Sequence, residues 1–182
     1  MTSTFIRKAI FLALLFIPIY GSAQTTKQDS IWQPLRFFVG SWNGKGGGEP
    51  GIGEYERNYQ FILNKRFIEI KNKSTYPPTE KYPKGEVHED IGYFSYDKVR
   101  HCFVLRQFHI EGFVNQFRLD SISADGKRIV FISEAIENIP TGWRAKETYQ
   151  LISDNEFSET FELAAPNKGF DKYTAVTLKR LK

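Results

Sequence analysis

The feature that most constrains this chain is a series of ten short segments rich in Val, Ile, Tyr, Phe and Thr, separated by Gly, Pro, Asn and Asp. Segments of this composition between turn-forming residues are typical of β-strands. No segment after the N-terminus repeats the i, i+3, i+4, i+7 apolar pattern of an amphipathic helix. The sequence therefore predicts an all-β protein with strands at 39–46, 53–63, 66–75, 86–96, 99–109, 113–122, 127–136, 143–152, 156–163 and 171–181.

The order and spacing of these strands favour one architecture, a ten-stranded antiparallel up-and-down β-barrel. Closure into a barrel removes the unpaired sheet edges that otherwise promote aggregation. A barrel of about ten strands is too wide for its own side chains to fill, so we expect a cavity. Before the first strand, Asp29 and Ser30 can cap a short helical turn that carries Ile31, Trp32, Leu35 and Phe38.

The connections between the strands differ in length at the two ends of such a barrel. Alternate connections share an end, which places loops 46–52, 73–85, 110–112, 137–142 and 164–170 together. The connections at the other end, at 64–65, 97–98, 123–126 and 153–155, are all tight. Because binding residues concentrate on long loops carried by a rigid scaffold, we expect the mouth of the cavity at the long-loop end. The glycines of 46–51 lack the Lys-Ser/Thr of a P-loop and predict no phosphate site.

The N-terminus has the pattern of a secretory signal peptide. Arg7 and Lys8 precede an apolar run over 9–20, and the small residues of 21–23 follow. The run is shorter than the roughly 20 residues of a membrane-spanning helix. We therefore predict cleavage after residue 23, a single mature domain over 24–182, a secreted or periplasmic location and no membrane association after cleavage. Loss of these two basic residues lowers the formal charge from +4 to +2, which argues against a nucleic-acid partner.

Cysteine and histidine are too scarce to predict disulfide, metal or nucleophilic chemistry. Cys102 is the single cysteine and cannot form an intrachain disulfide. His101 and His109 lie eight residues apart on one predicted strand, too far to share a metal ion at a rise of about 3.3 Å per residue. No G-x-S-x-G segment is present. We predict no metal site and no catalytic residue.

Charged residues interrupt the apolar faces of several predicted strands, and these interruptions are the candidate site. Burial of one unpaired charge costs several kcal/mol, so such residues should meet one another, water or a ligand. The predicted ligand-binding residues are Arg57, Tyr59, Arg106, Phe108, Glu134, Trp143, Glu147, Glu159 and Tyr173. Three interpretations stay open: an internal salt-bridge network, a polar cluster that fixes the head group of a mainly apolar ligand, and paired carboxylic acids with raised pKa that act as general acids.

Short motifs spread over much of the mature chain resemble the nitrobindin-like barrels. The segment 38–46 contains the G-x-W-x-G-x-G pattern of their first strand, 88–93 is similar to their H-x-E-x-G-Y segment with a displaced acid, and 177–180 resembles their last strand. The chain also resembles secreted bacterial barrel domains and the wider lipocalin and fatty-acid-binding architecture. In that architecture a Trp near the floor is covered by a late Arg, here Trp42 and Arg180.

The resemblance implies a ten-stranded barrel and, for nitrobindins, a b-type haem held by a histidine of the last strand. Tyr173 stands where that histidine would lie, and no His follows residue 109. A tyrosine can ligate ferric haem, so a haem barrel with Tyr173 as the axial ligand is one alternative. Our leading hypothesis is an exported barrel that binds a small apolar or amphipathic molecule, with no cofactor. An enzyme using interior carboxylates, a rim that engages another protein and self-assembly stay open.

Overall fold

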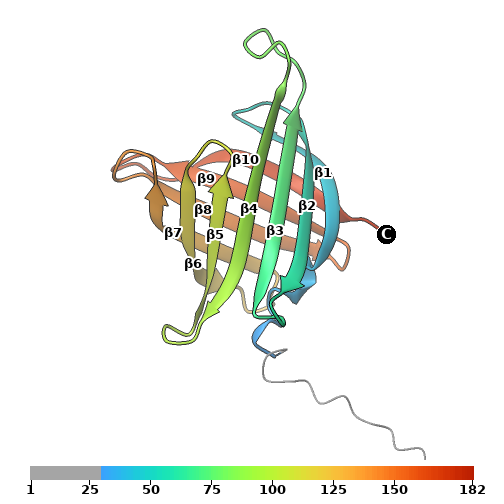
Figure 1. The fold of residues 1–182 in the computed structure, drawn as a ribbon, viewed down its shortest axis with the longest axis vertical. Coiled ribbons are helices and arrows are strands. Elements are labelled where there is room, and N and C mark those ends of the chain that lie inside the picture. Colours follow the sequence, from blue (N-terminus) through green and yellow to red (C-terminus); the bar gives the residue numbers. More distant parts are fainter. Residues whose placement is uncertain (1–29) are drawn as a thin grey trace, which may run out of the picture.

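The computed structural model describes residues 30–182, and over this range the chain forms one closed antiparallel barrel in which each strand pairs with its neighbours in sequence (Figure 1). The strands are β1 (Gly40–Gly48), β2 (Gly53–Ile62), β3 (Phe67–Tyr76), β4 (Glu86–Asp97), β5 (Cys102–His109), β6 (Val114–Ile122), β7 (Arg128–Glu137), β8 (Arg144–Ser153), β9 (Glu156–Ala164) and β10 (Asp171–Arg180). The predicted all-β, ten-stranded up-and-down barrel is confirmed. The strand predicted at 99–109 begins later, because a turn continues through His101, whose φ is 52°.

Alternation along each strand decides which side chains reach the interior. In β2, Tyr55, Arg57 and Tyr59 are buried, whereas the intervening Glu54 and Glu56 are exposed. Successive side chains of a strand point to opposite faces, so the buried set lines the inside of the barrel. Arg57 is thus an interior charge placed between two interior tyrosines.

The barrel closes where β1 pairs with β10 between Trp42 and Gly48 on one strand and Thr174 and Arg180 on the other. Gly44, Gly46 and Gly48 occupy the inner positions of β1 in this pairing. A Cβ on any of the three would overlap a carbonyl oxygen of β10. Glycine at these positions therefore permits the close approach of the first and last strands.

A short segment before β1 plugs one end of the barrel. The 3-10 helix η1 (Arg36–Phe38) places Phe38, which is fully buried, against the rings of Tyr59, Phe94 and Tyr149. Below Phe38, Arg180 lies with its guanidinium 4.0 Å from the centre of the Trp42 ring.

Arg180 also connects the segment that contains η1 to β10. It donates hydrogen bonds to the carbonyl oxygens of Val39, at 2.7 Å, and Phe37, at 2.6 Å. The helical turn is confirmed, and so is the Trp42–Arg180 pair that the lipocalin resemblance implies.

The two ends of the barrel therefore have different characters. The η1 end is filled by aromatic side chains and has tight connections, whereas the opposite end carries the long loops, with the β3–β4 loop projecting furthest (Figure 1). The predicted signal segment 1–23 lies outside the described residues. Over residues 30–182 no helix combines the length and the apolar character needed to cross a membrane.

Candidate functional site

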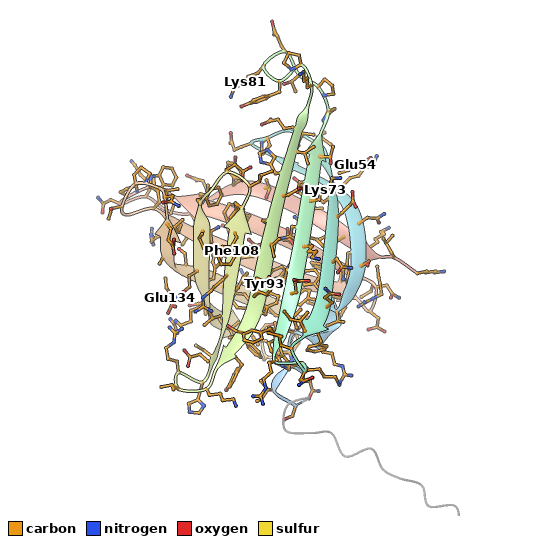
Figure 2. The ribbon with its side chains drawn as sticks, viewed as in Figure 1. Glu54, Lys73, Lys81, Tyr93, Phe108 and Glu134 are labelled. Carbon is orange, nitrogen blue, oxygen red and sulfur yellow. The ribbon has the colours of Figure 1, made fainter. Side chains whose placement is uncertain are left out.

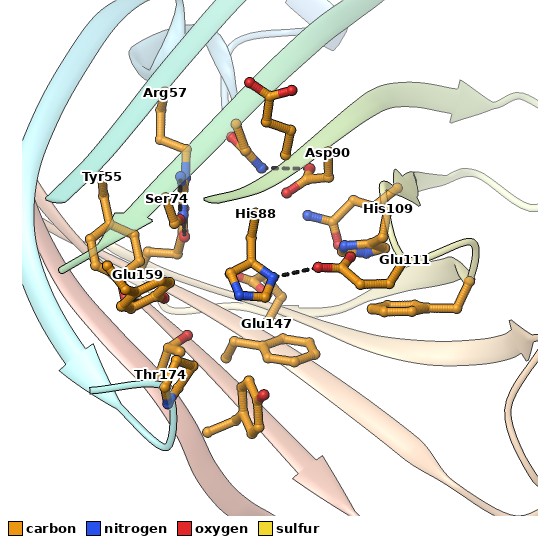
Figure 3. Close-up of a pocket in the computed structure, with 18 residues that line it drawn as sticks. Tyr55, Arg57, Ser74, His88, Asp90, His109, Glu111, Glu147, Glu159 and Thr174 are labelled. Atoms are coloured by element: carbon orange, nitrogen blue, oxygen red, sulfur yellow. Dashed lines mark hydrogen bonds and ion pairs between the residues drawn. The ribbon is translucent and has the colours of Figure 1, made fainter. Parts of the chain in front are cut away.

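A cavity of about 220 Å³ occupies the long-loop half of the barrel interior (Figure 3). Its walls come from the inner faces of β2, β3, β4, β5, β8, β9 and β10 and from two loops. Most lining side chains are polar or charged, with aromatic rings between them: Pro50, Tyr55, Arg57, Asn72, Ser74, Tyr76, His88, Glu89, Asp90, Gln107, His109, Glu111, Phe113, Glu147, Glu159, Phe161, Tyr173 and Thr174. The cavity lies at the predicted end, and it combines a polar cluster with aromatic walls.

A buried ion pair between β2 and β9 forms one side of the cavity. Nη2 of Arg57 lies 2.7 Å from Oε1 of Glu159, and Nε donates to both carboxylate oxygens at 3.2 Å. The third nitrogen, Nη1, donates to the carbonyl oxygens of Glu56 and Lys73 at 3.0 and 3.3 Å. All three guanidinium nitrogens of Arg57 are therefore engaged by acceptors of the protein itself.

Asp90 of β4 lies in the same cross-strand row as Arg57, with Asn72 of β3 between them. Asn72 of β3, which pairs with Asp90 in the sheet, donates a hydrogen bond of 2.8 Å from Nδ2 to its carboxyl group. Burial raises the pKa of Asp90 to about 6, although the positive charge of Arg57 acts in the opposite direction. Asp90 therefore titrates close to neutral pH.

Glu147 of β8 is the most isolated acidic group of the cavity. The residue is only 3% exposed, and its carboxyl group has no hydrogen-bond or ion-pair partner within residues 30–182. Burial, reinforced by the negative charge of Glu159, raises its pKa well above the ordinary value for glutamate. A buried polar group without a partner is costly, which marks this carboxyl group as one that a ligand could satisfy.

His109 adds no positive charge to this cluster at neutral pH. Burial lowers its pKa to about 4. The amide nitrogen of Asn115 lies 3.1 Å from Nε2 of His109, which fits a neutral ring that accepts at Nε2 and keeps its proton on Nδ1. The ring also stacks on Phe113 with centroids 4.1 Å apart.

Aromatic side chains surround the charged cluster and continue to the mouth. The hydroxyl groups of Tyr55 and Tyr76 are hydrogen-bonded at 2.9 Å, and the Tyr76 ring contacts His88 edge to face. His88 is in turn hydrogen-bonded to Glu111 of the β5–β6 loop (Figure 3). On the opposite wall, Tyr173 contacts the ring of Phe161.

The structure brings together four of the nine side chains predicted to bind a ligand. Arg57, Glu147 and Glu159 lie in the cavity, and Tyr173, at 37% exposure, lies nearer its mouth. Tyr59 is buried below them, packed on Phe38 and Phe94, and forms part of the aromatic floor.

The other four side chains lie elsewhere. Phe108 and Glu134 are on the outer surface (Figure 2), and Arg106 is on the same outer face of β5 as Phe108. Glu134 there pairs with Arg100 at 2.8 Å, and Arg106 donates to Gln116. Trp143 precedes β8 in a loop and is 37% exposed outside the cavity lining.

Several cavity residues were not predicted, chiefly Asn72, His88, Asp90 and His109. On β4, His88 and Asp90 share the inner face with Gly92 and Phe94. The large apolar residues of that face, Phe94 and Tyr96, lie only at the far end of the strand, so the part around His88 and Asp90 does not stand out as apolar in the sequence. The pairing of Asp90 with Asn72 is the informative signal, and it depends on the register of two strands.

The cavity does not fit the haem that the nitrobindin resemblance implies. Its volume of about 220 Å³ is below the roughly 300–1,000 Å³ of pockets that enclose drug-sized ligands, and a haem is at least as large as those ligands. Arg57, Asp90, Glu147 and Glu159 would also face the apolar edge of a porphyrin. Tyr173 therefore has no adjacent slot in which a haem could be seated.

Comparisons with known proteins support the fold. One solved structure, that of Rv2717c from M. tuberculosis, aligns with a TM-score of 0.59 at 19% identity, over 84% of this chain and 98% of that chain. This chain shares its fold with Rv2717c. No family model and no curated protein matches the sequence.

Two other solved structures match more weakly. A de novo designed fluorescence-activating β-barrel aligns with a TM-score of 0.40 at 14% identity, over 80% of this chain and 94% of that chain. A protein of unknown function from the DUF3598 family of Nostoc punctiforme aligns with a TM-score of 0.28 at 8% identity, over 84% and 99%. With TM-scores below 0.5, neither match bears on the function of this chain.

Proposed function

We propose that this protein is an exported binding protein that holds a small amphipathic molecule in the long-loop half of its barrel. The observation that carries the proposal is Glu147, a buried carboxyl group that faces a cavity and has no partner among the described residues. A purely structural network would pair this group, as it pairs Glu159 with Arg57. Export is supported by the signal-peptide pattern of residues 1–23.

The shape of the cavity supports binding of a head group with the rest of the ligand directed outwards. A volume of about 220 Å³ suits a small polar group with a few carbon atoms. The half-exposed ring of Tyr173, in contact with the ring of Phe161, offers an apolar path towards the mouth. A ligand with one polar end and an apolar remainder matches both parts.

Native mass spectrometry of the purified protein tests this function with two variants at adjacent positions of β3. Ser74 points into the cavity, whereas Thr75 is exposed on the outer face. We expect wild type and Thr75→Phe to carry a co-purifying small molecule, and Ser74→Phe, which fills the cavity, to lose it. The absence of any small molecule on wild type, or its retention by a folded Ser74→Phe variant, would contradict the proposal.

A further inference from the structure

The charge balance of the cavity narrows the chemistry of its ligand. Three interior carboxyl groups, from Asp90, Glu147 and Glu159, share the cavity with one guanidinium group, that of Arg57. The lining also includes Glu89 and Glu111, of which Glu111 is hydrogen-bonded to His88. His109 does not compensate, because burial holds its pKa at about 4 and keeps the ring neutral at physiological pH. The cavity therefore has an excess of acidic groups that the protein does not neutralise.

An anionic ligand would find no free donor in the cationic group of this cavity. Arg57 already directs Nε and Nη2 to Glu159 and Nη1 to two backbone carbonyl oxygens. A carboxylate head group would have to displace Glu159 and leave it buried without a partner, which is strongly unfavourable. The acceptors without a hydrogen-bond partner are the carboxyl group of Glu147 and Oδ1 of Asn72, next to Asp90. Nε2 of His88 also lacks a hydrogen-bond partner; in a neutral ring whose Nδ1–H donates to Glu111, this nitrogen is a further acceptor.

A metal ion does not match the spacing of these groups. Within residues 30–182, no three His, Cys, Asp or Glu side chains are close enough together to hold one metal ion. An ammonium group needs no set of three close ligands, because it can donate separate N–H hydrogen bonds to individual carboxyl groups. The geometry therefore favours an organic cation over an inorganic one.

Aromatic rings complete the environment that organic cations prefer. The rings of Tyr55, Tyr76, Phe113, Phe161 and Tyr173 line the same cavity as Glu147 and Asp90. Ring faces attract ammonium groups, most strongly where water is excluded. Within this barrel, the guanidinium of Arg57 already lies 5.3 Å from the centre of the Tyr55 ring, so the wall accepts a cation at this position.

We propose that the ligand of this barrel carries an organic ammonium group, which binds between Glu147 and Asp90 with its substituents against the aromatic wall. This inference rests on the proposed binding function and adds the sign of charge of the head group. Both carboxyl groups hold protons more readily than usual in the free protein, since burial raises the pKa of each. Binding of the cation at neutral pH therefore releases protons from the site.

Isothermal titration calorimetry with three probes of equal tail length tests the charge of the head group. The probes are n-octylammonium, n-octanoate and n-octanol, titrated into the full mature protein. We expect octylammonium to bind at least tenfold more tightly than octanoate or octanol. Tighter binding of octanoate or octanol would overturn the ammonium inference but would leave the binding function intact. If none of the three probes binds, the ammonium inference is also overturned; the binding function is then decided separately, by the mass spectrometry experiment.

Two variants of nearly unchanged shape test the site itself. Glu147→Gln removes the interior charge, and Glu54→Gln removes an exposed charge on the outer face of β2. We expect Glu147→Gln to weaken octylammonium binding at least tenfold and Glu54→Gln to leave it unchanged, with thermal melting of both variants showing that they fold. Equal affinity in wild type and a folded Glu147→Gln variant would overturn the assignment of the site.

Discussion

At the scale of single residues, the interior of this barrel contains one ion pair that is fully satisfied and two carboxyl groups that are not. Arg57 and Glu159 neutralise each other at 2.7 Å, whereas Glu147 has no partner and Asp90 has only the amide of Asn72 among residues 30–182. The satisfied pair stabilises the barrel, while the two other groups lower its stability and are available to a ligand. The difference between these roles can be measured.

Replacement of Arg57 by Met should be strongly destabilising, because it leaves Glu159 buried without its cation. We expect a loss of about 3–5 kcal/mol in the free energy of unfolding, measured by urea denaturation. The double variant Arg57→Met/Glu159→Leu removes both charges and should recover most of this loss. If the single variant is as stable as wild type, the pair does not have the structural role described here.

Asp90 should make the protein less stable as the pH rises. Its folded pKa of about 6 lies above the ordinary value of 3.8, so the unfolded chain loses its proton first. Stability relative to Asp90→Asn is therefore highest below about pH 4 and falls up to about pH 6, by at most about 3 kcal/mol. Urea denaturation at several pH values measures this change in the free energy of unfolding. Asp120→Asn, at an exposed position of β6, is the control. An equal pH dependence of wild type and Asp90→Asn would contradict the expectation.

At the scale of elements, the junction of β1 and β10 depends on the absence of side chains from the inner face of β1 between Gly44 and Gly48. A Cβ at Gly46 would overlap the carbonyl oxygen of Ala175, whereas a Cβ at the neighbouring Gly47 would meet its nearest atom at 3.3 Å. We therefore expect Gly46→Ala to lower the unfolding free energy by about 1–3 kcal/mol and Gly47→Ala to change it much less. Equal effects of the two variants in chemical denaturation would show that the junction tolerates a side chain.

The strands could be predicted from the sequence, but the face of a charged residue could be predicted only where the alternation is clear. On β8 and β9, Glu147 and Glu159 lie among buried residues separated by more exposed ones, and both were placed correctly inside the barrel. On β5 and β7, apolar runs such as Phe103–Leu105 occupy both faces. Arg106 and Glu134 therefore seemed to belong to the inner face, although both lie outside.

The cavity itself depends on information that no single strand contains. Asp90 becomes part of the site only because β3 and β4 pair it with Asn72, and because β4 and β5 pair it with His109. The side-chain pattern of β7 is further changed by a shift in register opposite Gln116 and Phe117. Register and bulges of this kind are set by the whole barrel, so the sequence pattern predicted the mouth and part of its polar lining, but not the contribution of β3, β4 and β5.

At the scale of the whole molecule, the two ends of the barrel have different roles: one end stabilises the fold and the other contains the proposed binding site. The floor around Phe38 is packed with aromatic side chains, and the opposite half contains the cavity. Phe38→Ala should lower the unfolding free energy by about 3–5 kcal/mol, as is typical of large-to-small changes in a core. Under conditions where the variant is folded, we expect it to bind octylammonium within about threefold of wild type by calorimetry; a tenfold loss would show that the two halves are coupled.

The measurement that tests the central claim most directly is an NMR titration with the tightest binder of the three octyl probes, followed through backbone amide shifts. The account predicts the largest shifts at the cavity, including Ser74, Asp90, Glu147 and Glu159, and small shifts at the floor around Leu35 and Phe38. Shifts concentrated on the outer surface or at the floor would contradict a ligand site in the long-loop half of the barrel.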